Sequence, residues 1–266
     1  MCRKTFRLII FKTKKMAKQK GIIKLEGTIG DITFYKSQDG FLAKGKGGIP
    51  ADRIANDPNF ARTRENGAEF GNAGKAGKTL RTALRALLQN SKDNRMVGRL
   101  ASKMVEVIQA DATNPRGLRN VIDGEAELLE GFDFNKNGKL GRALYAPYTA
   151  DIDRVLGTLT ANLAAFIPAN MIAAPGGTTH FKIISAGAEI DFENESFVVD
   201  TNETAIMPWD NVATAVINLA NTVTASSTHP LFLALGIEFY QEVNAVKYPL
   251  RNGAFNALSL VKVSGL

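Results

Sequence analysis

Residues 72–79 read NAGKAGKT, and their last three letters match the end of a phosphate-binding loop, G-x-x-x-x-G-K-[ST]. In such loops the glycines let backbone N–H groups surround the phosphates, while the lysine neutralises charge. Here Asn72 stands at the first glycine position, and residues 61–70 are polar and helix-like rather than a hydrophobic strand. We therefore expect a helical segment at this position and no NTPase.

Residues 133–138 read DFNKNG and match the first half of an EF-hand calcium loop, in which alternate oxygen side chains and a turn glycine surround the ion. The twelfth position, where a bidentate Glu is needed, holds Leu144, and Lys136 and Lys139 place positive charge near the supposed ion. An Asn-Gly turn between two β segments accounts for the same residues without a metal. We expect the turn, with a calcium site as the alternative.

Three carboxylates alternate at Asp191, Glu193 and Glu195, which predicts one exposed face of a strand; acid–base work or cation binding is the alternative. We expect His180 to be a packed histidine in an apolar strand and His229 to be a loop residue. Without a convergent set of catalytic groups, the sequence favours no enzyme, no metal and no cofactor.

The composition is that of a globular protein, with 45% apolar and 22% charged residues among 266. No apolar run approaches the roughly 18 to 20 residues that span a bilayer, and no signal peptide is recognisable. Cys2 is the only cysteine, so an intramolecular disulfide cannot form. These features predict a cytoplasmic location, or a place in an assembled particle, with no membrane partner.

Charge is divided unequally along the chain. Residues 1–130 hold 25 Lys+Arg and 14 Asp+Glu, a net +11, whereas residues 131–266 hold 8 and 12, a net −4. Six of the basic residues precede Met16. One hypothesis is that residues 1–15 are a non-native or disordered extension; the other is a basic arm that binds polyanions. Whether translation starts at Met1 or Met16 stays open.

The first half of the chain alternates between strand and helix signals. A β-hairpin is expected over residues 22–43, and Asp57-Pro58 has the residue types of a helix start. Glycines at 67, 71, 74 and 77 fall on neighbouring turns of that helix, which indicates close backbone packing or a local break. A second helix is expected over 93–110, followed by a short helical turn that ends at Glu130.

The second half has a β character. Strands are expected over 155–167, 180–184, 213–223, 231–243 and 257–263, with Arg251-Asn252-Gly253 as a hairpin turn. The predicted fold is α+β: an N-terminal β-hairpin and helical part (16–130) followed by an antiparallel β-sandwich-like part (131–266). Strand order, and whether the two parts share one core, are left open.

Basic residues gather on the expected helices between residues 58 and 110. Residues 61–120 hold 12 basic and 5 acidic residues, a local +7 that suits nucleic-acid phosphates or an acidic partner. A solvated helix face is the alternative, and no known nucleic-acid-reading module is recognisable. The candidate contact residues are Arg62, Arg64, Lys75, Lys78, Arg81, Arg85, Arg95 and Arg99.

Residues 27–36 (GTIGDITFYK), Asp57-Pro58, residues 62–66 (RTREN), residues 236–239 (GIEF) and Asn252-Gly253 resemble a family of uncharacterised proteins from Bacteroidota. An association of that family with phage or prophage is one hypothesis. The resemblance covers most of the chain from Met16. It implies no activity, cofactor or catalytic residue.

Together these observations favour a non-enzymatic structural or interaction protein, such as a subunit of a phage-like or other self-assembling particle. Opposite charge on the two halves would let copies pair head to tail. The alternative is a binding module, either for polyanions through the basic helices or for carbohydrate or protein through the β part. The oligomeric state, the host process and the partner are not fixed by the sequence.

Overall fold

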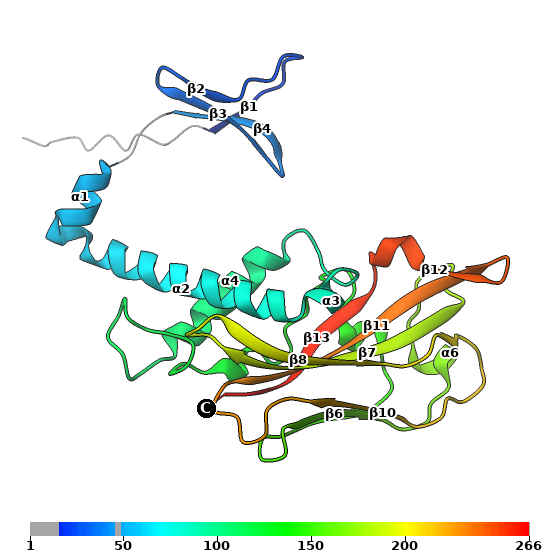
Figure 1. The fold of residues 1–266 in the computed structure, drawn as a ribbon. Coiled ribbons are helices and arrows are strands. Elements are labelled where there is room, and N and C mark those ends of the chain that lie inside the picture. The colour runs from blue at the N-terminus through cyan, green and yellow to red at the C-terminus, as the bar shows by residue number, and fades with distance from the viewer. Residues whose placement is uncertain (1–15, 46–48, 266) are drawn as a thin grey trace, which may run out of the picture. The chain divides into compact units, whose positions relative to one another are not determined.

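The computed structural model describes residues 16–45 and 49–265, and the extension predicted for residues 1–15 lies outside them (Figure 1). The chain divides into two compact units, Met1–Ala61 and Arg62–Leu266. Each unit is described by itself.

The first unit is a small antiparallel sheet followed by short helices. Its strands are β1 (Met16–Lys18), β2 (Gly27–Ile29), β3 (Ile32–Ser37) and β4 (Gly40–Gly45), in the order β1-β4-β3-β2. The predicted hairpin is confirmed: β3 pairs with β4, and Ser37 Oγ accepts a hydrogen bond from Asp39 N at 3.1 Å in the turn between them. Within the predicted range 22–43, residues 22–26 lie outside any strand, and a turn at Gly30-Asp31 divides the first arm into β2 and β3. Strand β1 precedes the predicted range and pairs with β4.

The helix expected to begin at Asp57-Pro58 in fact begins earlier. Helix α1 spans Ala51–Asn56, a 3₁₀ turn spans Pro58–Phe60, and α2 follows directly. Asp57 does act as a cap, because its carboxylate accepts from Asn59 N at 2.9 Å. The cap signal was therefore correct, but a short helix already precedes it.

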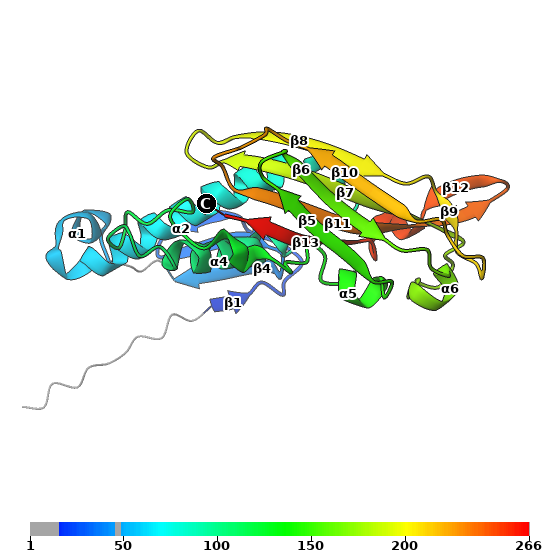
Figure 2. The same cartoon turned by 90° about the horizontal axis from the view of Figure 1, so that it is seen from below.

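The second unit contains three layers (Figures 1 and 2). The helical layer consists of α2 (Ala61–Ala83), α3 (Arg85–Leu88) and α4 (Met96–Gln109). The middle layer is a six-stranded antiparallel sheet, and the third layer is a three-stranded sheet ordered β10-β6-β5. The short helices of this unit are a 3₁₀ turn at Ala126–Leu129, α5 (Leu140–Ala143), α6 (Pro168–Met171) and a second 3₁₀ turn at Leu250–Gly253.

The middle sheet has the path β12-β11-β7-β8, with β13 also paired to β11 and β9 to β7. Its strands are β7 (His180–Asp191), β8 (Ser196–Glu203), β9 (Met207–Pro208), β11 (Leu231–Val243), β12 (Val246–Pro249) and β13 (Ala257–Ser264). The strands of the outer sheet are β5 (Tyr148–Asp153), β6 (Thr158–Leu163) and β10 (Ile217–Thr222).

The two central strands are buried on both faces, and their side chains alternate between two cores. On β11, Phe232 and Ala234 pack against the helices, whereas Leu231, Leu233 and Leu235 pack against the outer sheet. Such strands read as continuous apolar runs, which is why residues 231–243 are easily predicted from sequence.

The predicted boundary near residue 130 is not where the chain divides. Buried side chains of α2 and α4, such as Leu80 and Met104, share one core with Ile184 of β7 and Leu258 of β13. Since helices and strands are covered by each other, residues 62–130 and 131–265 form one unit. The α+β class with an antiparallel, sandwich-like β part is confirmed.

The glycine stripe of α2 has a different cause from the one expected. A Cβ added at Gly67, Gly71 or Gly74 would meet nothing within 4 Å, so three of the four glycines face open space. Only Gly77 faces a neighbouring helix, with Leu100 of α4 at 3.7 Å from the built Cβ. Close packing is therefore confined to one position.

Several features of the β part also differ from expectation, and strands β8 and β12 were not predicted. The turn that returns the chain along β11 is at Asn244-Ala245, both with positive φ, rather than at Arg251-Asn252-Gly253. Strands β12 and β13 both run antiparallel to β11, and residues 250–256 leave the sheet between them. Strand β5 was not predicted, because its residues are mostly polar and only partly buried.

Candidate functional site

The sheet of the first unit has one apolar face. Antiparallel register places residues that face each other across strands on the same side, and Ala17 pairs with Ala43, Ala43 with Phe34, and Ile29 with Ile32. Phe41, opposite Lys36, lies on this side as well. We call this side the apolar face; it is formed by Ala17, Ile29, Ile32, Phe34, Phe41 and Ala43.

No described residue of the first unit, from Met16 to Gly45 and from Ile49 to Ala61, is buried. Ile29 is 62% exposed and Ile32 is 46% exposed, although both belong to the apolar face. The opposite side carries the polar residues Thr28, Thr33 and Lys44, and with them Met16, Tyr35 and Leu42. Apolar side chains thus occur on both sides of the sheet. The apolar face has more of them, and no described residue of the unit forms a buried core beneath it.

A second surface, in the helical layer, is a groove of about 450 Å³ between the end of α2 and the start of α4. Lys78, Arg81 and Arg85 line it from α2 and α3, and Lys92 lines it from the loop that follows. Spacings of three, four and seven residues place the first three on one helix face. We call these four residues the basic groove.

The basic groove has a uniform charge. Among the described residues that line it there is no Asp or Glu, and the other lining side chains include Thr82, Gln89 and Met96. Helix α2 gives way to α3 at Leu84, where φ is −87° and ψ is 16°, and the chain then turns back through Lys92. The helical hydrogen bonds continue to Gln89, and the chain leaves the helix there, so that Lys92 lines the groove from the following loop.

The other candidate residues do not join the groove. Arg62 forms an ion pair with Glu65 at 3.0 Å, and Arg62 and Arg64 lie at the start of α2, more than roughly 20 Å along the helix from Lys78. Lys75 lines a different hollow, which it shares with Asp123 and two glutamates of the β7–β8 turn. Arg95 is exposed just before α4.

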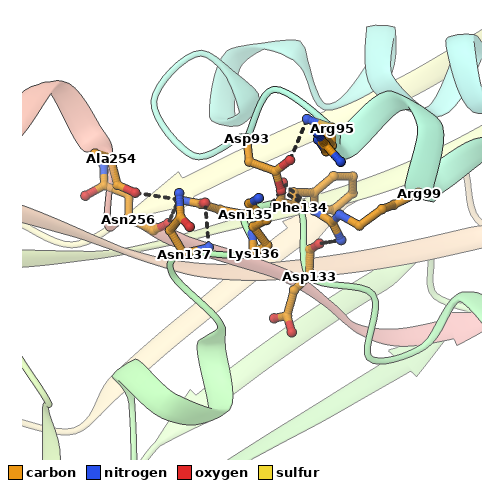
Figure 3. Close-up of polar contacts among 10 residues, drawn as sticks. All are labelled: Asp93, Arg95, Arg99, Asp133, Phe134, Asn135, Lys136, Asn137, Ala254 and Asn256. Carbon is orange, nitrogen blue, oxygen red and sulfur yellow. Dashed lines mark hydrogen bonds and ion pairs between the residues drawn. The ribbon is translucent and has the colours of Figure 1, made fainter. Parts of the chain in front are cut away.

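Arg99 faces inward and holds the helical layer to the β part (Figure 3). Its guanidinium pairs with Asp93 and donates to the backbone oxygens of Asp133, at 2.7 Å, and Phe134, at 3.2 Å. Burial alone would raise the pKa of Asp93, but hydrogen bonds from Lys136 N, Arg95 N and the guanidinium lower it. We therefore assign Arg99 a structural role and drop it from the candidate contacts.

The calcium-loop look-alike is built around hydrogen bonds within the protein (Figure 3). Asn135 is 1% exposed; its amide donates to the carbonyls of Ala254 and Asn256, and its oxygen accepts from Asn137 N. The Asp133 carboxylate accepts from Leu140 N at 3.1 Å. These oxygens serve as turn and helix caps, which supports the turn interpretation. Within the described ranges, no group of three or more His, Cys, Asp or Glu could hold a metal ion.

The phosphate-loop look-alike is helical, as expected. Residues 72–79 lie entirely inside α2, and the Thr79 hydroxyl donates to Lys75 O one turn earlier, at 3.2 Å. In a helix these backbone N–H groups bond to carbonyls four residues back and cannot surround a phosphate.

The alternating carboxylates do not share a strand face, contrary to expectation. Strand β7 ends at Asp191, and Glu193 and Glu195 belong to the turn that leads to β8. Asp191 caps this turn, because Asn194 donates to it from both its backbone N–H and its side-chain amide, which lowers the pKa of the carboxylate. The turn is closed by Glu195 at φ 52°.

The two histidines are far from each other. His180 lies at the start of β7, where its ring contacts the Thr179 hydroxyl and Glu242, whereas His229 lines a small hollow with Glu189 and Asp191 at the other end. Twelve strand residues separate these ends by roughly 35 Å. The described residues therefore do not bring the two imidazoles into one site.

Comparisons with known proteins leave the question of function to the structure itself. No known protein family matches the sequence, and no curated protein matches it. A solved structure, the reeler domain of human F-spondin, is similar over 47% of this chain and 99% of that one, with 13% identity and a TM-score of 0.17. A similarity at this level carries no argument about fold or function. The resemblance to a Bacteroidota family stays a prediction.

Sequence reasoning missed some of the residues that this structure brings together. Lys92 counts among the basic residues of the helical region in the sequence, but it is not one of the candidate contacts, and the structure adds it to the groove from the loop before α4. A further set, Lys136, Lys139, Arg142 and Arg251, lines one pocket and comes from separate segments that no spacing rule connects. No helix among residues 16–45 and 49–265 is long and apolar enough to cross a membrane.

Proposed function

We propose that this chain is a non-enzymatic structural or interaction protein that self-associates through the apolar face of its N-terminal sheet. The observation that carries the proposal is that six apolar residues share one side of a four-stranded sheet in which no described residue is buried. A sheet this small gains stability from packing its hydrophobic side against another element.

The energetic reason is the area that stays in contact with water. Burying an isoleucine or phenylalanine side chain contributes about 1.5–3 kcal/mol. The unit has 61 residues, and a unit of about 60 residues buries only about 60% of the surface of its unfolded chain and is marginally stable by itself. Among its described residues the unit has no cysteine for a disulfide and no metal-binding group, since Cys2 lies outside them.

We favour a second copy of the chain as the partner. Two amphipathic sheets pack face to face at about 10 Å, with interdigitated apolar side chains, as in β-sandwiches. The apolar face is self-complementary in chemistry, because Lys36 is its only charged residue on the paired strands and sits beside Phe41 with Nζ 5.5 Å from the ring centre. A symmetric pair of this kind suits a subunit of a phage-like or other self-assembling particle.

The test is the mass of the chain in solution. Light scattering after size-exclusion chromatography should give a discrete multiple of the chain mass for the wild type and a monomer for Phe34→Glu. Thr33→Glu is the matched control, because it adds the same charge one residue away on the opposite side of β3. A monomeric wild type at about 100 µM, or equal loss of assembly in both variants, refutes the proposal.

A second candidate function is polyanion binding by the basic groove. The specific observation is that Lys78, Arg81, Arg85 and Lys92 converge on one groove whose described lining includes no carboxylate. Phosphates of a nucleic acid are neutralised by such clusters irrespective of base sequence. This function and self-association use different units, so the chain can have both.

A further inference from the structure

A pocket of about 390 Å³ lies in the β part of the second unit, where the segments 136–143, 173–176 and 251–255 meet the end of β11. We propose that this pocket binds a small organic phosphate with a flat ring, of about mononucleotide size. Four basic side chains line it, Lys136, Lys139, Arg142 and Arg251, and no carboxylate occurs among its described lining residues. We call it the anion pocket.

The positive charge of the anion pocket is not neutralised by ion pairs with described residues of the chain. None of its four basic side chains forms an ion pair with a described residue. Lys182, by contrast, pairs with both Glu203 and Glu238. Gathering four like charges around one hollow is unfavourable unless an anion neutralises them, and it raises the local concentration of anionic ligands.

The number of charges favours a multiply charged anion. A monocarboxylate would leave most of the positive charge uncompensated, whereas a phosphate monoester carries about −1.5 to −2 at neutral pH and offers three acceptor oxygens. Arg142 and Arg251 can each donate two parallel N–H bonds to phosphate oxygens, and the two lysines add point charges.

One wall of the pocket is apolar and suits the rest of such a ligand. Phe239 and Phe255 line it together with Ala173, Ala174 and Pro175. The guanidinium of Arg251 lies over the Phe255 ring, 5.4 Å from its centre. The cationic group that would bind the phosphate therefore lies next to the apolar wall that would contact the ligand's flat ring. A volume of 390 Å³ is within the range of about 300–1,000 Å³ that small-ligand pockets occupy.

Arg251 is presented to the pocket by an unusual backbone. Arg251, Asn252 and Gly253 have φ of 46°, 51° and 76°, three successive left-handed residues of which two are not glycine. Non-glycine residues rarely adopt this conformation, and such strain concentrates at ligand sites.

The strained segment is held from outside by buried amides (Figure 3). Asn135 donates to the carbonyls of Ala254, at 3.0 Å, and Asn256, at 2.8 Å, while Asn256 donates to Asn90 O at 3.1 Å. A Cβ at Gly253 would lie 2.2 Å from that same Asn90 oxygen, so the segment is seated directly on the loop before α4. These hydrogen bonds fix the backbone next to Arg251 without a ligand, which lowers the cost of ordering it on binding.

The test uses the full chain and three probes: adenosine 5′-monophosphate, inorganic phosphate and adenosine, titrated by calorimetry at low salt. We expect saturable binding of the monophosphate, binding of phosphate alone at least about tenfold weaker, and no saturable binding of adenosine below about 1 mM. Arg142→Gln with Arg251→Gln should weaken the monophosphate by more than about 30-fold.

Lys20→Gln with Arg116→Gln is the matched control, because it removes the same net charge from two exposed positions outside both the anion pocket and the basic groove. Less than about threefold weakening by this control supports a defined pocket. Equal weakening by both pairs, or no saturable binding of any probe, overturns the proposal. Phosphate binding as strong as that of the monophosphate overturns the role of the apolar wall. Arg142 and Arg251 are exposed, so folded variants are expected, and circular dichroism verifies this.

Discussion

Removal of the three helix charges of the basic groove should change how strongly nucleic-acid binding depends on salt. The perturbation is the triple variant Lys78→Gln, Arg81→Gln and Arg85→Gln. The three side chains follow one helix face over roughly 10 Å, given a rise of 1.5 Å per residue, and Lys92 completes the set. Four phosphate contacts are therefore the most that the groove can make with four side chains.

Each phosphate contact releases counterions, so that for duplex DNA the logarithm of the binding constant falls with the logarithm of salt with a slope of about −0.9 per contact. Four contacts give a slope of about −3.6. Between 50 and 200 mM salt the affinity should then fall by roughly 150-fold. With Lys92 alone the slope becomes about −0.9 and the fall only about 3- to 4-fold.

The assay is fluorescence anisotropy of a labelled 20-base-pair duplex at four salt concentrations. The control variant Lys18→Gln, Lys20→Gln and Lys247→Gln removes three exposed charges from other elements and should keep the wild-type slope. If the groove variant keeps the wild-type slope, or if the control loses as much, binding comes from net charge rather than from the groove. Equal salt slopes for the groove variant and the control variant would thus refute the reasoning.

Three further predictions concern stability and are checked by thermal melting. Gly74→Ala should raise the free energy of unfolding by up to about 1 kcal/mol, because an added Cβ meets nothing and alanine favours helix; an unchanged or lower midpoint contradicts this. Gly187→Ala should lower it by about 1–3 kcal/mol, since the built Cβ lies 2.8 Å from Asn221 Cβ between the two sheets; full tolerance would show that the sheets can shift. Burial alone would raise the pKa of Asp111, but hydrogen bonds from Asn114 and other N–H groups lower it to about 2. The stabilisation is complete above pH 3.8 and is lost as the pH falls towards 2, so Asp111→Asn should flatten the dependence of the melting midpoint on pH in this range; parallel profiles would exclude the carboxylate as the cause.

The fold class was accessible from sequence because the strongest elements carry their signals locally. Helix α4 has an apolar stripe at helical spacing. Strand β11 begins with a continuous apolar run that is typical of a strand buried on both faces. The division of the chain was not accessible, because it depends on which side chains cover which. Leu80 and Leu258 are 178 positions apart and share a core, and no periodicity records that.

The candidate sites show the same limit. A stripe such as Lys78, Arg81 and Arg85 can be found by spacing. The position of Lys92 beside it depends on where the helix ends, after Leu88, and no glycine or proline in residues 84–93 marks that end. The apolar face of the N-terminal sheet depends on register: a one-residue slip would move Phe34 to the opposite side. The sequence shows which residues are apolar, but the register of strand pairing decides on which side of the sheet each of them lies.

Net charge is a poor guide to where this protein meets an anion. Some of the basic residues in the +11 half are paired with carboxylates of the same half, as are Arg99 with Asp93 and Lys103 with Glu106. The anion pocket, in contrast, takes all four of its cations from the half with a net charge of −4. The local charge of unpaired basic side chains is therefore a better guide to an anion site than the net charge of a half of the chain. Charges farther away than the Debye length of about 8–10 Å are largely screened, and a paired cation contributes little potential. The segment that failed as a calcium loop supplies Lys136 beside the buried Asn135, so the same turn that leaves no ligand oxygens for a cation builds a wall for an anion.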